Sequence, residues 1–133
     1  MNKTASLQVG FARVNVNPQM GMEVRGYYQS RKAIGVLDDL ELNVVAVNHG
    51  DDTVLIMALD NCNMPTDFAI QLRTAISEKT SVPTEAIFIH SIHTHTGPDL
   101  SIKKREANCS LFLFVKNSKK CLIFILLLLT NKN

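Results

Sequence analysis

Paired cysteines and an apolar leader segment are both missing from this sequence. The three cysteines, Cys62, Cys109 and Cys121, form no CxxC pair and are odd in number. This pattern predicts neither a disulfide framework nor a cysteine-based zinc knuckle, and it favours free thiols in a reducing compartment. The N-terminal stretch MNKTASLQVGFARV lacks the apolar core of a secretory signal. We therefore expect a cytoplasmic protein.

Glycine, proline and aspartate are absent from residues 103–133, whereas residues 1–102 contain all six glycines and all four prolines. The charge changes at the same place. The first part has seven Lys and Arg against eleven Asp and Glu, and the second part has seven against one. We therefore divide the chain into a partial domain, 1–102, and an unrelated tail, 103–133, that is not a domain. Such a tail is typical of translation past a frameshift or truncation, which we hold as a hypothesis.

A hydrophobic run long enough to cross a membrane is also missing. The apolar run from Cys121 to Leu129 has nine residues, whereas a spanning helix needs about 20. No transmembrane span is predicted. Because Lys116, Lys119 and Lys120 precede this run, a weak contact with a membrane surface stays open, as in a peripheral membrane-associated protein.

Strand patterns and turn signals alternate in the first half of the chain. Leu7 to Val16 alternates loosely and ends at an Asn-Pro turn signal. Leu42 to Val47 is rich in β-branched residues, and residues 49–52 predict a hairpin turn after it. The nearly continuous apolar run Thr53 to Leu59 predicts a strand buried on both faces. Gln19 to Gly35 is expected to form a long loop, and loops of this length are more often functional than incidental.

A helix and a further strand follow. Pro65 suits the first position of a helix that is expected to run to about Lys79. Its apolar face is formed by residues at helical spacing, namely Phe68, Leu72, Ala75 and Ile76. Ala86 to Ser91 predicts a second buried strand. The order strand, helix, strand indicates a βαβ unit with parallel strands, so the fold class is α/β with a mixed sheet.

Polar side chains follow both strands of this predicted unit. Asp60 comes directly after the first strand, and His93 and His95 come just after the second. Because the carboxyl ends of parallel strands meet at one rim of a sheet, we expect Asp60 close enough to orient an imidazole or to help hold a metal. If the chain stays extended, His93 and His95 point to one side and His90 to the other. For His90 and His49 we favour structural roles.

The two imidazoles of His93 and His95 are suitable zinc ligands. A catalytic zinc takes three protein ligands and a water, and an HxH pair supplies at most two of them. Spacing alone leaves two interpretations open, a metal or catalytic site and a merely polar loop.

The stretch HTHTGP, residues 93–98, is similar to THTHSGP, the signature of the neutral/alkaline, non-lysosomal ceramidase family, which the sequence resembles over about residues 7–100. Upstream, VGFARVNVNPQMGMEVRGY (9–27), GVLDDLELNVVAV (35–47) and VLIMALD (54–60) resemble its opening segments in the same order. Many relatives have His where this chain has Leu37, Pro where it has Asp39, and Arg where it has Asn43, so a substrate contact is expected to differ.

The resemblance implies a zinc-dependent amidohydrolase that cleaves the N-acyl bond of ceramide-like sphingolipids or another N-acyl substrate. It implies that His93 is a zinc ligand and that His95 lines the substrate site and hydrogen-bonds the reacting groups. We take His95, together with Asp60 from its place at the rim, as the candidate catalytic residues. Gly26 is implied to lie in the loop near the substrate. No nucleic-acid partner is expected.

The resemblance also implies that the chain is a fragment of a larger ceramidase-type catalytic domain. Family members take their remaining zinc ligands from downstream segments, so we expect little or no amidase activity from the chain alone. Two alternatives to an enzyme stay open, a non-catalytic fragment with part of a metal site and the membrane-associated protein described above.

Overall fold

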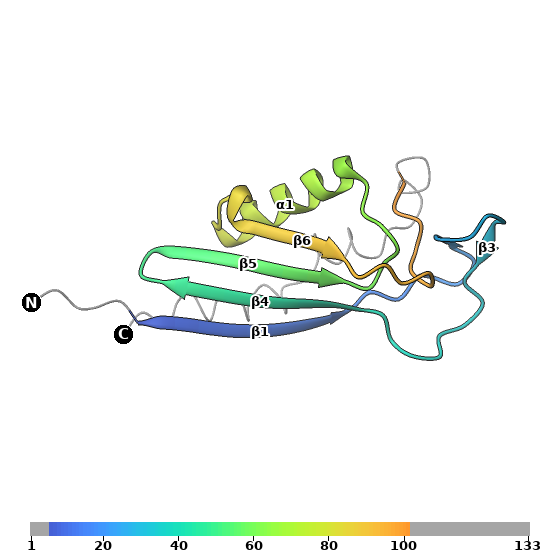
Figure 1. Ribbon diagram of the computed structural model, residues 1–133, viewed down its shortest axis with the longest axis horizontal. Coiled ribbons are helices and arrows are strands. Elements are labelled where there is room, and N and C mark those ends of the chain that lie inside the picture. Colours follow the sequence, from blue (N-terminus) through green and yellow to red (C-terminus); the bar gives the residue numbers. More distant parts are fainter. Residues whose placement is uncertain (1–5, 102–133) are drawn as a thin grey trace, which may run out of the picture.

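The computed structural model describes residues 6–101 (Figure 1). The boundary of the partial domain and the expectations for the tail, including its membrane contact, lie outside these residues. The described elements follow in chain order: β1 (Leu7–Asn15), β2 (Glu23–Val24), β3 (Arg31–Lys32), β4 (Glu41–His49), β5 (Asp52–Leu59), α1 (Thr66–Thr80), the 3₁₀ turn η1 (Thr84–Ala86) and β6 (Ile87–Ser91). No helix among these residues is long and apolar enough to cross a membrane.

The larger sheet has the strand order β1-β4-β5-β6. β4 pairs antiparallel with β1 and β5, and β5 pairs parallel with β6. The mixed sheet, the βαβ unit and the hairpin turn between His49 and Asp52 are therefore confirmed. This arrangement places the carboxyl ends of β1, β5 and β6 at one rim of the sheet, together with the start of β4.

One face of the sheet forms the core with α1 (Figure 1). Cross-strand neighbours on this face are apolar, as in the rows Val14, Leu42, Leu59 and Ala46, Leu55, Ile87. Phe68, Leu72 and Ile76 of α1 are buried against them, and Ala75 packs partly buried at the side. The helix face predicted by the spacing is thus confirmed, since these positions recur every three or four residues.

The prediction that β5 is buried on both faces is wrong for the described structure. Its residues alternate, with Leu55 and Met57 buried while Val54 and Ile56 are 43% and 42% exposed. The same holds for β6, where Phe88 is 58% exposed. The reason is that α1 covers one face of the sheet, so only every second side chain enters the core.

The helix and the last strand differ slightly from their predicted bounds. Pro65 is the N-cap and lies one residue before the helix, where its ψ of 140° is extended. Ser81 ends the helix in the left-handed conformation, with φ 60°. Ala86 belongs to η1, so β6 begins at Ile87.

The segment predicted as one long loop, Gln19 to Gly35, contains a short antiparallel ribbon of β2 and β3. It leaves the sheet after β1 and returns at β4, so it extends beyond the rim where β5 and β6 end (Figure 1). A bridge between Val24 and Pro98 ties the ribbon to the segment that carries the histidines. The ribbon is thereby positioned next to the candidate site.

Candidate metal centre

The segment that follows β6 is held to the segment that follows β5 by backbone hydrogen bonds. The Ile92 amide donates to the Leu59 carbonyl at 3.1 Å, and the His93 amide donates to the Asn61 carbonyl at 2.9 Å. Asn61 is 1% exposed, and its Nδ2 donates to the Pro98 carbonyl at 2.9 Å. The parallel pairing of β5 and β6 thus continues into the two loops and brings position 93 beside positions 61 and 62.

The extended conformation assumed for the HxH segment is wrong. β6 ends at Ser91, and His93 has a φ of 72°, in the left-handed region. The two rings nevertheless converge, with centroids 4.9 Å apart and planes at 74°. The chain turns at His93, so the convergence results from a turn and not from strand alternation.

The contacts of the His93 ring favour one tautomer of the neutral imidazole. Nδ1 lies 2.7 Å from the Cys62 carbonyl oxygen. A carbonyl oxygen only accepts, so Nδ1 carries the proton and the neutral ring keeps a lone pair on Nε2. Nε2 lies 3.2 Å from Nε2 of His95. In metal-binding histidines one ring nitrogen usually bonds a backbone carbonyl or carboxylate while the other faces the metal, and here Nε2 of His93 faces the second histidine.

Cys62 is the third member of this group. One ligand atom from each of Cys62, His93 and His95 lies within 4.8 Å of the others, so the three residues can hold a metal ion. Cys62 is 8% exposed, and its Sγ lies 4.0 Å from Nδ1 of His93. Sequence reasoning missed Cys62 because it looked for cysteine pairs. The signal available was its position, two residues after Asp60 at the same rim.

Asp60 lies at the rim as predicted but makes a different contact. Its Oδ2 accepts a hydrogen bond from the Glu41 amide at 2.9 Å, which joins the end of β5 to the start of β4. It is not a member of the grouped ligand atoms. His90 is outside the group as well; its exposed ring lies 5.7 Å from that of Phe88. His49 lies at the opposite end of the sheet, beside the hairpin turn.

Gly26 lies directly against His95. A Cβ atom at Gly26 would be 2.6 Å from Cγ of His95, and the φ of +108° is one that other residues rarely adopt. Only glycine therefore fits here without displacing the ring. The next residue, Tyr27, contacts His95 edge-on with centroids 5.9 Å apart. The loop predicted to lie near a substrate thus forms one wall around the second histidine.

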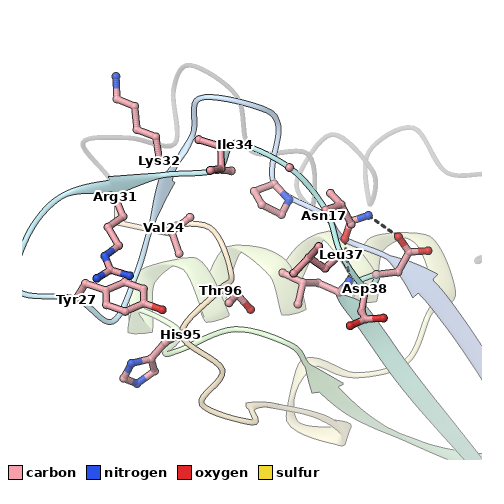
Figure 2. A pocket seen from close by; sticks show the side chains of 16 residues that line it. Asn17, Val24, Tyr27, Arg31, Lys32, Ile34, Leu37, Asp38, His95 and Thr96 are labelled. Atoms are coloured by element: carbon pink, nitrogen blue, oxygen red, sulfur yellow. Dashed lines mark hydrogen bonds between the residues drawn. The ribbon is translucent and has the colours of Figure 1, made fainter.

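A pocket of about 470 Å³ opens between the ribbon and the segment before β4 (Figure 2). Its lining is mostly apolar and includes Val24, Ile34, Val36, Leu37 and Leu40. Polar side chains also line it, among them His95, Tyr27, Arg31 and Asp38. Figure 2 shows Tyr27, Arg31 and His95 together at one end and Asp38 at the other. His95 belongs both to the metal-ligand group and to the lining of this pocket.

No protein-family model matches this chain, and no curated protein matches it in sequence. The likeness to ceramidases therefore stays a prediction from the quoted motifs. The roles of His93, His95, Asp60 and Gly26 stay predictions with it.

Proposed function

We propose that the chain forms a zinc centre of amidohydrolase type, acting on the N-acyl bond of a ceramide-like lipid or a related N-acyl compound. This proposal rests on the position of His95, whose ring belongs both to the metal-ligand group and to the lining of the pocket. Its Nε2 faces His93 at 3.2 Å, and its ring also lines an apolar pocket. A metal ion held by this group would therefore lie at the end of a cavity that suits an acyl chain.

The distance between the two histidine nitrogens fits tetrahedral zinc. Two nitrogen ligands of tetrahedral zinc, each about 2.05 Å from the metal, are about 3.3 Å apart. The two Nε2 atoms of His93 and His95 are 3.2 Å apart. A site that combines imidazole and thiolate ligands suits zinc better than hard cations such as magnesium or calcium. All three ligand atoms lie within 4.8 Å of one another, and a nitrogen–sulfur spacing of about 3.5 Å would place the Cys62 thiol in the same tetrahedron.

Three protein ligands would leave one coordination position open, which is the arrangement of catalytic zinc sites. Zinc in such a site supplies Lewis acidity and lowers the pKa of water. The remaining tasks belong to the chain itself. The Cys62 carbonyl fixes the His93 tautomer, Gly26 leaves room for the His95 ring, and the apolar pocket orients the acyl chain.

An amidase assay on the full chain tests this proposal. The protein is loaded with one equivalent of zinc and incubated with N-hexanoyl sphingosine, and released hexanoate is measured by mass spectrometry. The resemblance alone implied little or no activity, because the family's remaining zinc ligands lie downstream. With Cys62 as a third ligand from within the chain, we instead expect release that is lost after chelation and in the His93→Ala variant. His49→Ala, at the far end of the sheet, is the matched control and is expected to keep full activity.

Absence of hexanoate release from the zinc-loaded chain would contradict the hydrolase proposal. Release that persists in the chelated protein and in His93→Ala would contradict the role of the metal centre. Zinc binding without release, in turn, would favour the alternative in which the chain is a metal-binding protein without catalytic activity.

A further inference from the structure

We infer that the pocket beside His95 binds an amphiphile with an acyl chain and an anionic head group, such as an N-acyl amino acid. Arg31 would bind the anionic group. The inference rests on the proposed function and names the substrate class for the same site.

Three apolar side chains that line the pocket are exposed to solvent. Ile34 and Leu37 are 95% and 101% exposed, and Val36 between them is 45% exposed. All three line the pocket. Contiguous exposed apolar surface of this kind marks a binding site, because covering it with a hydrocarbon chain removes it from water. An acyl chain is the complementary partner.

The cationic end of the pocket is built by Arg31. Its guanidinium carbon lies 4.0 Å from the centroid of the Tyr27 ring, and that ring in turn contacts His95. Stacking on an aromatic ring fixes the plane of a guanidinium while its N–H donors stay available. Among the described residues, no carboxylate forms an ion pair with Arg31. A bound carboxylate would supply the missing counter-charge through charge-assisted hydrogen bonds.

The charges of the pocket are separated. Asp38 lies at the other end, away from Arg31 and His95 (Figure 2). Lys32 also lines the pocket, but successive strand residues point to opposite sides, and its side chain extends away from Tyr27 (Figure 2). The positive charge beside His95 is therefore that of Arg31. An anionic group is attracted to this end and repelled from the other.

The reaction implied for such a substrate balances with water alone. The amide C–N bond breaks, and a C–O bond forms between the acyl carbon and the water oxygen. One water proton goes to the leaving nitrogen. The products are a fatty acid and a free amino acid, so the head group leaves from the Arg31 end.

Binding of two matched amphiphiles tests the inference without relying on turnover. N-dodecanoylglycine and N-dodecanoylethanolamine have the same chain and differ in head-group charge. Each is titrated calorimetrically into the full chain below its micellar concentration, with and without zinc. We expect the anionic compound to bind about tenfold more tightly, as a charge-assisted contact provides. Arg31→Gln is expected to remove this preference and to leave the neutral compound unaffected.

Lys32→Gln is the matched control, since it removes the same charge from the adjacent residue. We expect it to keep most of the preference. Equal affinity of the two compounds for the wild type would overturn the inference, as would an undiminished preference in Arg31→Gln or an equal loss in Lys32→Gln. A head-group preference in a chain that does not bind zinc would leave the inference standing and contradict the zinc centre, so the two failures are distinguishable.

Discussion

The two ends of the sheet have similar polar residues but differ in what they do with them. The hairpin end carries His49, Asp51 and Asp52, and the rim at the other end carries Cys62, His93 and His95. At the hairpin, Nδ2 of Asn48 donates to the Asp52 carbonyl and to Thr53 Oγ1, which closes the turn. At the rim, Asn61 joins two loops that are distant in sequence.

The difference lies in topology. A hairpin connects two neighbouring strands by a turn of two residues, so its side chains spread outward into solvent. The rim gathers the ends of parallel strands, and parallel pairing brings two separate loops together. His93 therefore meets Cys62, which is 31 positions away in the chain. Among the described residues, a group of metal-ligand atoms therefore forms where two loops converge, and none forms at the hairpin turn.

Replacing the histidine at each end should give the largest contrast. His93→Ala is expected to reduce zinc affinity by at least about 100-fold. Mutating a residue that only hydrogen-bonds to a metal ligand already lowers metal affinity about 10- to 100-fold, and His93 is itself a proposed ligand. His49→Ala should leave zinc affinity unchanged. Isothermal titration with zinc measures both variants, and a similar affinity for the two would remove the distinction between rim and hairpin.

A second contrast concerns two glycines with positive φ. Gly26→Ala places a methyl group 2.6 Å from the His95 ring, whereas a Cβ at Gly21 meets nothing within 4 Å. Both variants should lose roughly 1–3 kcal/mol of stability from the backbone conformation alone. Only Gly26→Ala should also weaken zinc binding, by about tenfold, because it displaces a ligand. Thermal unfolding and zinc titration separate the two effects, and equal zinc affinities would argue against the contact with His95.

The asparagines at the two ends provide a smaller contrast. Asn61→Ala leaves the buried Pro98 carbonyl without its donor and should cost about 1–3 kcal/mol of unfolding free energy. Because the loops separate, zinc affinity should fall as well. Asn48→Ala should cost about 1 kcal/mol and leave zinc affinity unchanged. Chemical denaturation with and without zinc measures the stability and the zinc affinity of both variants. A larger loss of zinc affinity in Asn48→Ala than in Asn61→Ala would contradict the role of Asn61 in holding the two loops together.

The smallest effect is expected at Asp39, beside the pocket. Hydrogen bonds from Asn17 and then Asn15 lower the pKa of this carboxyl below its ordinary value of 3.8. A lowered pKa in the folded state means that the stabilisation is present above the unfolded value and is lost as the pH falls through the folded value. Asn17→Ala should raise the pKa of Asp39, as followed by NMR titration, and Asn48→Ala should not. An unchanged midpoint in Asn17→Ala would show that the contact at 2.7 Å is not maintained in solution.

Much of the fold could be predicted from local patterns in the sequence. The four strands of the larger sheet, the helix face at Phe68, Leu72 and Ile76 and the parallel pairing of β5 with β6 follow from periodicity and element order, whereas the short strands β2 and β3 were expected to be loop. Burial could not be predicted in the same way. The apolar run in β5 gave no sign that Val54 and Ile56 face away from the helix, because that depends on what covers each face of the sheet.

The candidate site was predictable only in part. Element order alone placed Asp60, His93 and His95 at one rim. The membership of Cys62 depends on the path of the loop after β5, which Asn61 and the Pro98 carbonyl hold in place. The turn at His93 has a positive φ in a residue that is not glycine, which no local pattern indicates.

The cobalt spectrum of the full chain tests the central claim most directly, because a thiolate bound to cobalt produces a charge-transfer band in the near ultraviolet. We predict one cobalt per chain, with a tetrahedral visible spectrum and this band. The band should be lost in Cys62→Ser and kept in a variant in which Cys109 and Cys121 are both replaced by serine. A band that survives in Cys62→Ser, or a chain that binds no cobalt, would contradict a metal centre formed by Cys62, His93 and His95.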